Sequence, residues 1–324
     1  MNCSTFLIAT ILILTAALLL QPIVQVDAQA NPGDIIVTER DINILSKITP
    51  GGVRTVIFTF AGGSAPAGVA IDSAGNYIVT EQNIDVLSKI TPGGTRTVIY
   101  TFAGGTLPYG VAVDSGGNYV VAESQTNVLS KITPSGVRTV IYTFAGSTNP
   151  IGVAIDSAGN YIVTEYGTGV LSKITPGGVR TPIISGLNGP VFVAIDSQGN
   201  YIVTEMALNV LSKITPGGVR TPILTFAVGS GLSGIAIDSA GNYLVTEQLT
   251  NVLSKTTPGG VRTVTFTFAG GTDPFGVAIV QTPPRPVGGL VMPTNKIEIL
   301  TPYVALAGLI IAVSAVAVVK RRRD

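Results

Sequence analysis

Six glutamates recur at nearly equal intervals, and each ends a short apolar run that reads Val-Thr-Glu or Val-Ala-Glu. They are Glu39, Glu81, Glu123, Glu165, Glu205 and Glu247. If the repeats close into a ring, these carboxylates would line one mouth of its channel, where oxygen ligands could hold a hard cation such as Ca²⁺. Alternatively, each glutamate supports its own repeat by hydrogen bonding to a turn or to the next repeat. We favour this second interpretation and predict no metal site and no cofactor, with Ca²⁺ at the six glutamates as the alternative.

The composition excludes several other kinds of chemistry. The chain has no histidine, the commonest general base and transition-metal ligand. Its one cysteine, Cys3, lies in an N-terminal segment that we expect to be removed, so neither disulfides nor thiol chemistry are expected. The net charge is +1, and the one basic run is at residues 320–323, so we expect no binding of nucleic acid. The lysines and arginines that recur with the repeat are expected on a solvated outer wall.

A five-residue turn, Asp-Ser-x-Gly-Asn, defines the period of the sequence. The turns begin at Asp72, Asp114, Asp156, Asp196 and Asp238, in steps of 42, 42, 40 and 42 residues. Such a period implies a repeat architecture. The turns are too short to surround Ca²⁺ with six or more oxygen ligands, and an ordinary β-turn explains their Asp, Gly and Asn.

One repeat contains four short runs typical of β-strands, at residues 68–71, 76–81, 86–90 and 95–102. Four antiparallel strands in about 42 residues make one blade of a β-propeller. A β-solenoid is the alternative, but its coils are usually shorter and its two ends need caps. Pro182 and Pro222 lie in the fourth strand of their repeats, which predicts that this strand is at the sheet edge, as in a propeller.

The order of strands at the two ends of the array decides between these architectures. The array begins at the second strand of a repeat and ends with an isolated first strand at residues 276–280. Pairing of that last strand with the strands within residues 34–60 would close a ring and leave no free inner edge. We therefore predict an all-β fold, a six-bladed β-propeller over residues 31–280, closed by pairing of its N-terminal and C-terminal strands.

The repeat Pro-x-Gly-Val-Ala-Ile-Asp-Ser-Ala-Gly-Asn-Tyr-Ile-Val-Thr-Glu resembles the NHL repeat, and the resemblance covers residues 33–280. It implies a six-bladed propeller, and it extends to streptogramin lyases and gluconolactonase-like enzymes of that fold. Streptogramin lyases depend on histidine, which this chain lacks, and gluconolactonase-like enzymes use an asymmetric set of Glu, Asn and Asp around a metal. No such set stands out among the repeated acids, so the resemblance implies the fold without the chemistry.

Segments at the two ends of the chain predict that the protein is exported and anchored in a membrane. Residues 1–30 have the apolar core and the small-x-small cleavage site of a signal peptide, but no basic residue precedes Arg40, so an uncleaved N-terminal anchor is the alternative. Residues 281–302 form a Pro- and Gly-rich stalk, residues 303–319 a transmembrane helix, and residues 320–324 a basic cytoplasmic tail. This order resembles the sorting segments of archaeal and bacterial surface proteins. We expect a single-pass plasma-membrane protein, prokaryotic and in particular archaeal, with an extracellular propeller.

Differences between the repeats predict the binding surface. The Asp-Ser-x-Gly-Asn and Thr-Pro-x-Gly turns share one end of the ring and hardly vary, whereas the loops at the other end differ in every copy. Because loops on a rigid scaffold usually carry binding residues, we predict a ligand-binding face at this variable end. Its predicted residues are Tyr109, Ile151, Tyr166, Phe192, Leu232, Asp273 and Phe275. The alternative is that the loop residues vary because nothing constrains them.

Together these features predict a recognition or adhesion module that binds an extracellular protein or glycan, and we do not expect an enzyme. Two alternatives stay open. One is an extracellular propeller hydrolase or lyase with a divalent metal, and the other is a structural component of a surface layer. The sequence predicts no particular oligomeric state.

Overall fold

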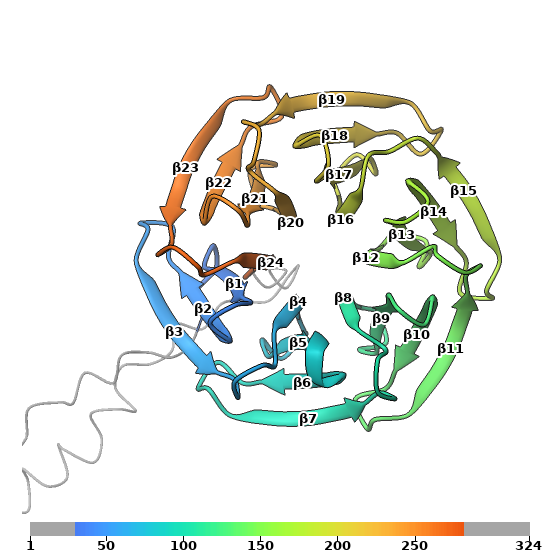
Figure 1. Cartoon of the computed structure of the whole chain (residues 1–324), viewed down its shortest axis with the longest axis horizontal. Coiled ribbons are helices and arrows are strands. Elements are labelled where there is room, and N and C mark those ends of the chain that lie inside the picture. The colour runs from blue at the N-terminus through green and yellow to red at the C-terminus, as the bar shows by residue number, and fades with distance from the viewer. Residues whose placement is uncertain (1–29, 282–324) are drawn as a thin grey trace, which may run out of the picture. The chain divides into compact units, whose positions relative to one another are not determined.

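The computed structural model describes residues 30–281, whose strands form six four-stranded antiparallel sheets around a central axis (Figure 1). Five sheets, here called blades 1 to 5, are continuous in the chain. Blade 1 contains β4 (Pro66–Ile71), β5 (Tyr77–Glu81), β6 (Val86–Ile90) and β7 (Arg96–Thr101), and blade 2 contains β8 (Pro108–Val113), β9 (Tyr119–Glu123), β10 (Val128–Ile132) and β11 (Arg138–Thr143). Blade 3 contains β12 (Pro150–Ile155), β13 (Tyr161–Glu165), β14 (Val170–Ile174) and β15 (Arg180–Ile184), and blade 4 contains β16 (Pro190–Ile195), β17 (Tyr201–Glu205), β18 (Val210–Ile214) and β19 (Arg220–Thr225). Blade 5 contains β20 (Leu232–Ile237), β21 (Tyr243–Glu247), β22 (Val252–Thr256) and β23 (Arg262–Thr267), and the one helix within residues 30–281 is the short 3-10 turn η1 (Gln82–Ile84).

The sixth sheet, here called the closing blade, combines strands from both ends of the ring. It contains β24 (Pro274–Ile279), β1 (Ile35–Glu39), β2 (Ile44–Ile48) and β3 (Arg54–Thr59), in that order. β24 and β1 are antiparallel, with Ile35 opposite Ile279 and Val37 opposite Val277. Figure 1 shows the last strand of the ring beside the first. The predicted six-bladed propeller and its closure are confirmed.

The closing blade rebuilds its missing turn from two separate chain segments. In blade 1 the turn is closed by a hydrogen bond from Asp72 N to Asn76 O at 2.9 Å. In the closing blade Val280 N donates to Asp34 O at 2.9 Å, and Gly33 N donates to Val280 O at 2.8 Å. The closing blade thus has backbone hydrogen bonds like those of a turn, although its two segments are not joined by a continuous turn.

The fourth strand of each blade is the outer one, as the two prolines predict. Figure 1 shows β3, β7, β11, β15, β19 and β23 around the perimeter of the ring. Pro182 pairs with Ser172 and Pro222 with Ser212, both beside a β-bulge, and both prolines are exposed. Proline has no N–H to donate, so it is tolerated at an edge or a bulge and not in a central strand.

The hydrophobic core lies in the six seams, the spaces between neighbouring blades. In the seam between blades 1 and 2, Ile78 and Leu87 pack against Tyr119 and Val121, and all four are 0–3% exposed. The second strand of every blade is buried along its whole length, because blades cover both of its faces. Apolar area buried in the seams, at about 25 cal/mol per Å², therefore drives the ring together.

Near the axis, a threonine of the second strand connects the first strands of two blades. Thr80 Oγ1 accepts a hydrogen bond from Gly68 N at 2.8 Å and donates one to Tyr109 O of blade 2 at 2.5 Å. The same two bonds are made by Thr38, Thr164, Thr204 and Thr246. A Cβ on Gly68 would lie 2.2 Å from Tyr109 O, so a side chain there would force the two strands apart.

The predicted signal peptide, stalk, transmembrane helix and basic tail lie outside the described residues, apart from Ala30 and Gln281. Within residues 30–281, no helix is long and apolar enough to cross a membrane. Export and anchoring therefore stay predictions from the sequence.

Blade 2 lacks the threonine bridge, because Ala122 stands where the other blades have threonine. The first strands approach just as closely there, since a Cβ on Gly110 would lie 2.3 Å from Ile151 O. Ala122 is fully buried, and alanine has no hydroxyl to connect the two strands. The seam between blades 2 and 3 therefore has the geometry of the others without their bridge.

Ala122→Thr is expected to stabilise the protein by about 1 kcal/mol, because it adds a buried hydroxyl that can donate and accept as in the other blades. Urea denaturation of the intact chain measures the change. Ala122→Val is the matched control, since it adds a similar volume without a hydroxyl. Equal stabilisation by both variants would assign the gain to packing and contradict the bridge.

Candidate functional site

The variable end of the ring is hollowed at the central axis. A pocket of about 320 Å³ lies there, lined by loops and by the beginnings of first strands. Its apolar lining is Leu107, Tyr109, Ile151, Tyr166, Val191, Met206 and Phe275, and its polar lining is Arg40, Ser124, Gln125, Asn149 and Gln248. Every blade except blade 1 contributes, so this site, here called the axial pocket, is formed by the closed ring.

Phe275 forms the centre of the axial pocket. Its ring centroid lies 5.9 Å from that of Tyr109 and 5.5 Å from that of Phe192, in tilted and edge-on geometries that aromatic pairs favour. Only 4% of Phe275 is exposed, and it packs in a small separate cluster with Ile151 and Val191. Side chains therefore fill the channel at this level, so that a ligand would meet a cup closed by Phe275 and not an open pore.

One cation and one carboxylate meet at the rim of the axial pocket. The guanidinium carbon of Arg40 lies 4.3 Å from the centroid of the Phe275 ring, within the range of a cation–π contact. Arg40 also forms an ion pair of 2.6 Å with Asp273 and contacts Gln248 Oε1 at 3.5 Å. The pKa of the Asp273 carboxyl is raised, because burial and the nearby Asp41 both disfavour its charged form. Arg40 favours the charged form but does not cancel this increase. The pairing orients Arg40 over the aromatic floor and largely neutralises its charge.

The structure brings four of the seven predicted binding residues together in this pocket, namely Tyr109, Ile151, Tyr166 and Phe275. A fifth, Phe192, packs against Phe275 from the side of blade 4. Tyr109 and Tyr166 are half-buried, so part of each ring faces solvent. The variable end thus has a single aromatic centre to which four blades contribute.

Two of the predicted binding residues, Leu232 and Asp273, are not part of the pocket lining. Leu232 is fully buried in the seam between blades 4 and 5, where it is a core residue. The Asp273 side chain is 13% exposed and is ion-paired with Arg40. Phe275, another predicted binding residue, is 4% exposed, because the first strands converge on the axis and direct their side chains toward one another.

Sequence reasoning predicted Tyr166 but missed four equivalent residues of other blades, Arg40, Ser124, Met206 and Gln248. Arg40, Ser124, Tyr166, Met206 and Gln248 each directly follow the glutamate that ends a second strand, and all five line the pocket. The position after the repeated glutamate is the signal that could have identified them, since it follows a motif that recurs in every blade and lines the pocket in five of the six blades.

The six repeated glutamates do not line the axial pocket. Each forms an ion pair of 2.6 or 2.7 Å with the arginine that begins the fourth strand of its own blade. Glu123 accepts hydrogen bonds from Arg138 Nε at 2.7 Å, Arg138 Nη2 at 2.8 Å and Ser130 Oγ at 2.5 Å. Within residues 30–281, no group of three or more Asp, Glu, His or Cys side chains is placed to hold a metal ion. Each glutamate supports its own blade through an arginine, and Glu123, Glu165 and Glu247 also accept a hydrogen bond from a threonine of the turn that follows their strand.

The repeated arginines are therefore not a purely solvated outer wall. Their side chains are 23–31% exposed, while the paired glutamates are 0–3% exposed. A carboxylate buried to this degree needs a partner, because an unpaired charge loses its hydration without compensation. The arginine reaches across the third strand from the blade edge and supplies that partner.

Solved structures of similar fold give the class of this protein, whereas no protein-family model and no curated protein matches the chain. Virginiamycin B lyase from Staphylococcus aureus is 20% identical, over 78% of this chain and 87% of that chain, with a TM-score of 0.64. A catalytically inactive histidine-to-alanine variant of that lyase, with quinupristin, is also 20% identical, over 77% of this chain and 89% of that chain, with a TM-score of 0.62.

A chain of the nidogen/laminin complex is 16% identical, over 77% of this chain and 99% of that chain, with a TM-score of 0.68. At these identities the likeness establishes the fold alone. The protein is an all-β, six-bladed β-propeller of the kind found in streptogramin lyases. Because its neighbours range from a lyase to a chain of a laminin complex, the fold does not select the function.

Replacing Arg138 by Met is expected to destabilise the protein by about 3 kcal/mol, because it leaves the Glu123 carboxylate buried and unpaired. The double variant Arg138→Met with Glu123→Gln should recover most of this loss, since the amide carries no charge. Thermal and urea denaturation of the intact chain measure both effects. An Arg138→Met variant as stable as the parent would show that water, and not the arginine, satisfies the carboxylate.

Proposed function

We propose that this protein is a recognition module without catalytic activity, which binds an extracellular protein or glycan at the axial pocket. The observation that carries the proposal is the lining of that pocket, where aromatic and aliphatic side chains are surrounded by amide and hydroxyl groups. Tyr109 and Tyr166 offer half-exposed rings, and Gln125 and Gln248 offer hydrogen-bonding amides. Such a lining suits the apolar face and hydroxyls of a sugar ring, or an amphipathic side chain of a protein.

The size and charge of the axial pocket restrict what enters it. Its volume of about 320 Å³ is at the lower end of the range for ligand pockets, enough for one sugar ring or one large side chain. Because Arg40 is paired with Asp273, the pocket carries little net charge. An uncharged group therefore fits better than an ion, and the rest of a larger ligand would extend over the loops of the variable end.

The available side chains support binding over catalysis. The pocket lining contains no carboxylate, and the chain contains no histidine. The similar virginiamycin B lyase is inactive when a histidine is replaced by alanine. Histidine and the carboxylates, the commonest general acids and bases, are thus missing from the lining, and a hydrolase or lyase activity would need another group, such as the phenol of Tyr109 or Tyr166.

The proposal extends to the location of the protein. Residues 1–30 support export, residues 303–319 support a single-pass anchor, and the basic residues 320–323 support a cytoplasmic end. The resemblance of the repeats to NHL repeats and of the tail to sorting segments supports a prokaryotic, in particular archaeal, surface protein. The propeller would then present its axial pocket to ligands outside the cell.

Binding of the intact purified chain to arrays of surface glycans and envelope proteins tests the recognition function. Tyr109→Ala and Tyr166→Ala are each expected to weaken binding by about 10-fold or more, because aromatic anchors contribute about 2 kcal/mol at such sites. Tyr142→Ala is the matched control, since Tyr142 is also half-buried but lies on the outer strand β11. Melting temperatures establish that all three variants are folded.

Full binding by both axial-pocket variants would show that the ligand binds elsewhere on the ring. Turnover of a bound ligand, with a divalent metal in the purified protein, would favour a hydrolase or lyase. Ordered self-assembly of the purified chain without any ligand would favour a structural component of a surface layer.

Truncation after Pro284 is expected to release the propeller into the medium, because it removes the apolar residues 303–319 that would anchor the chain. Immunoblots of washed membranes and of medium measure the distribution of the intact and truncated forms. Retention of the truncated form in membranes would instead assign the anchor to an uncleaved segment within residues 1–30.

A further inference from the structure

One seam of the ring differs from the other five at the first residue of its second strand. That residue is a tyrosine in blades 1 to 5, namely Tyr77, Tyr119, Tyr161, Tyr201 and Tyr243. Each is 0–4% exposed and packs against the preceding blade, as Tyr119 packs against Ile78. In the closing blade the residue is Ile35, which packs against Leu244 of blade 5.

Each tyrosine directly follows an Asp-Ser-x-Gly-Asn turn, so it lies at the turn end of its seam. Burial raises the pKa of Tyr119, and the carboxylate of Asp72 raises it further. The same two causes act on Tyr161 with Asp114, on Tyr201 with Asp156 and on Tyr243 with Asp196. Each of these seams therefore contains a slot for one phenol ring, with the aspartate of an Asp-Ser-x-Gly-Asn turn near its polar end.

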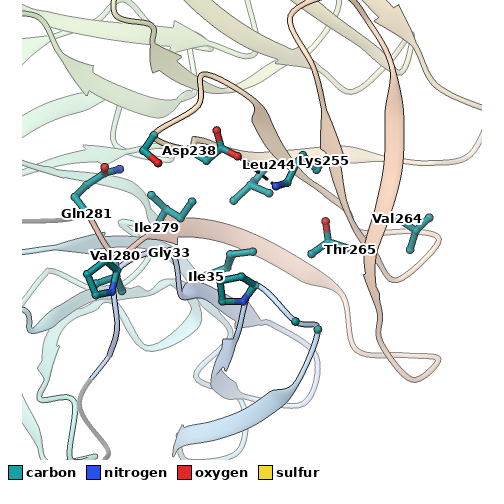
Figure 2. A pocket seen from close by; sticks show the side chains of 15 residues that line it. Gly33, Ile35, Asp238, Leu244, Lys255, Val264, Thr265, Ile279, Val280 and Gln281 are labelled. Carbon is teal, nitrogen blue, oxygen red and sulfur yellow. Dashed lines mark ion pairs between the residues drawn. The ribbon is translucent and has the colours of Figure 1, made fainter.

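The corresponding slot between blade 5 and the closing blade is open, because Ile35 lacks the ring and the hydroxyl of tyrosine. A pocket of about 530 Å³ lies there, here called the seam pocket. Figure 2 shows Ile35 and Leu244 beside this space, with Ile279 close by and the ion pair of Asp238 and Lys255 along its edge. Asp238 begins the turn of blade 5, so it corresponds to the aspartate near each tyrosine.

Ring closure explains why the seam pocket is larger than one ring. The closing blade has no continuous turn, and the two chain segments that replace the turn contribute Gly33 and Val280 to the pocket lining. Gln281 adds an amide, and Val264 and Thr265 of β23 line the outer side. The pocket therefore combines an unfilled tyrosine slot with the space beside the divided turn.

The polar edge of the seam pocket suits a hydroxyl group. Asp238 accepts hydrogen bonds from Asn242 N at 2.8 Å and Asn242 Nδ2 at 2.9 Å, and its Oδ2 lies 3.4 Å from Lys255 Nζ. Burial raises the pKa of the Asp238 carboxyl, but the hydrogen bonds from Asn242 and the nearby Lys255 outweigh burial and lower it. Asp238 thus stays ionised as an acceptor, and Lys255, whose side chain is 42% exposed, can turn to donate.

We propose that the seam pocket binds a small phenol or a related hydroxylated aromatic molecule. The ring lies against Ile35 and Leu244, in the place that a tyrosine ring fills in the other seams, and the hydroxyl is bound by Asp238 and Lys255. The remaining volume accepts a substituent on the ring, since about 530 Å³ is within the usual range of ligand pockets. This site is at the turn end of the ring, and it is independent of the axial pocket.

Calorimetric titration of the intact chain with 4-methylphenol, which is the tyrosine side chain itself, tests the proposal. We expect about one equivalent to bind, with a Kd on the order of 1 mM for so small a ligand. Toluene, which lacks the hydroxyl, should bind about 10-fold more weakly. Ile35→Tyr should fill the slot and weaken 4-methylphenol binding by about 10-fold or more, whereas Ile35→Val, the matched control, should keep it.

If Ile35→Tyr does not fold, a second variant tests the same proposal by removing a tyrosine from another seam. Tyr161→Ile opens the same slot between blades 2 and 3, so the number of bound 4-methylphenol molecules should rise from about one to about two. Unchanged affinity in a folded Ile35→Tyr variant would overturn the proposal. An unchanged stoichiometry in folded Tyr161→Ile, or no saturable binding to the parent chain, would overturn it as well.

Discussion

The ring depends on how closely its first strands approach one another at the axis. A carbonyl of each first strand lies against the preceding blade at a position that is usually glycine, and in five of the six blades a threonine hydroxyl connects the two strands. An added Cβ at Gly68 would come within 2.2 Å of Tyr109 O, so a larger residue there would push the blades apart. Blade 4 has Phe192 at this position, and its ring packs against Phe275 in the channel. The blade without glycine at this position thus supplies a side chain that helps to form the floor of the axial pocket.

The same convergence decides what kind of site the axis can offer. Side chains that begin the first strands meet on the axis, so Phe275 and Ile151 close the channel and leave a cup for a ligand. The repeated glutamates cannot form a free ring of carboxylates there, because each is already bound by an arginine of its own blade. What the axial pocket presents is an aromatic surface with amides and hydroxyls around it, which is suited to recognising uncharged groups.

A closed ring made from one chain has one point at which the chain enters and leaves, and here one turn of the repeat is interrupted at that point. In this protein the break falls in the turn between β24 and β1, which backbone hydrogen bonds hold together without a continuous loop. The residue that would carry the tyrosine is Ile35, and a pocket opens beside it. The seam pocket thus lies where the ring closes, whereas the axial pocket lies where the first strands converge.

The period, the turn residues and the order of strands at the two ends were enough to predict the six blades and their closure, because these depend on local chain geometry and on the pairing of edges. Pro182 likewise identified the outer strand, since a missing N–H is a local property. Only the tertiary structure decided which loop residues are buried, as Phe275 and Leu232 are, because burial depends on side chains from other blades. It also decided that Arg138 pairs with Glu123, 15 residues away along the chain, since that contact crosses an intervening strand whose twist sets the distance.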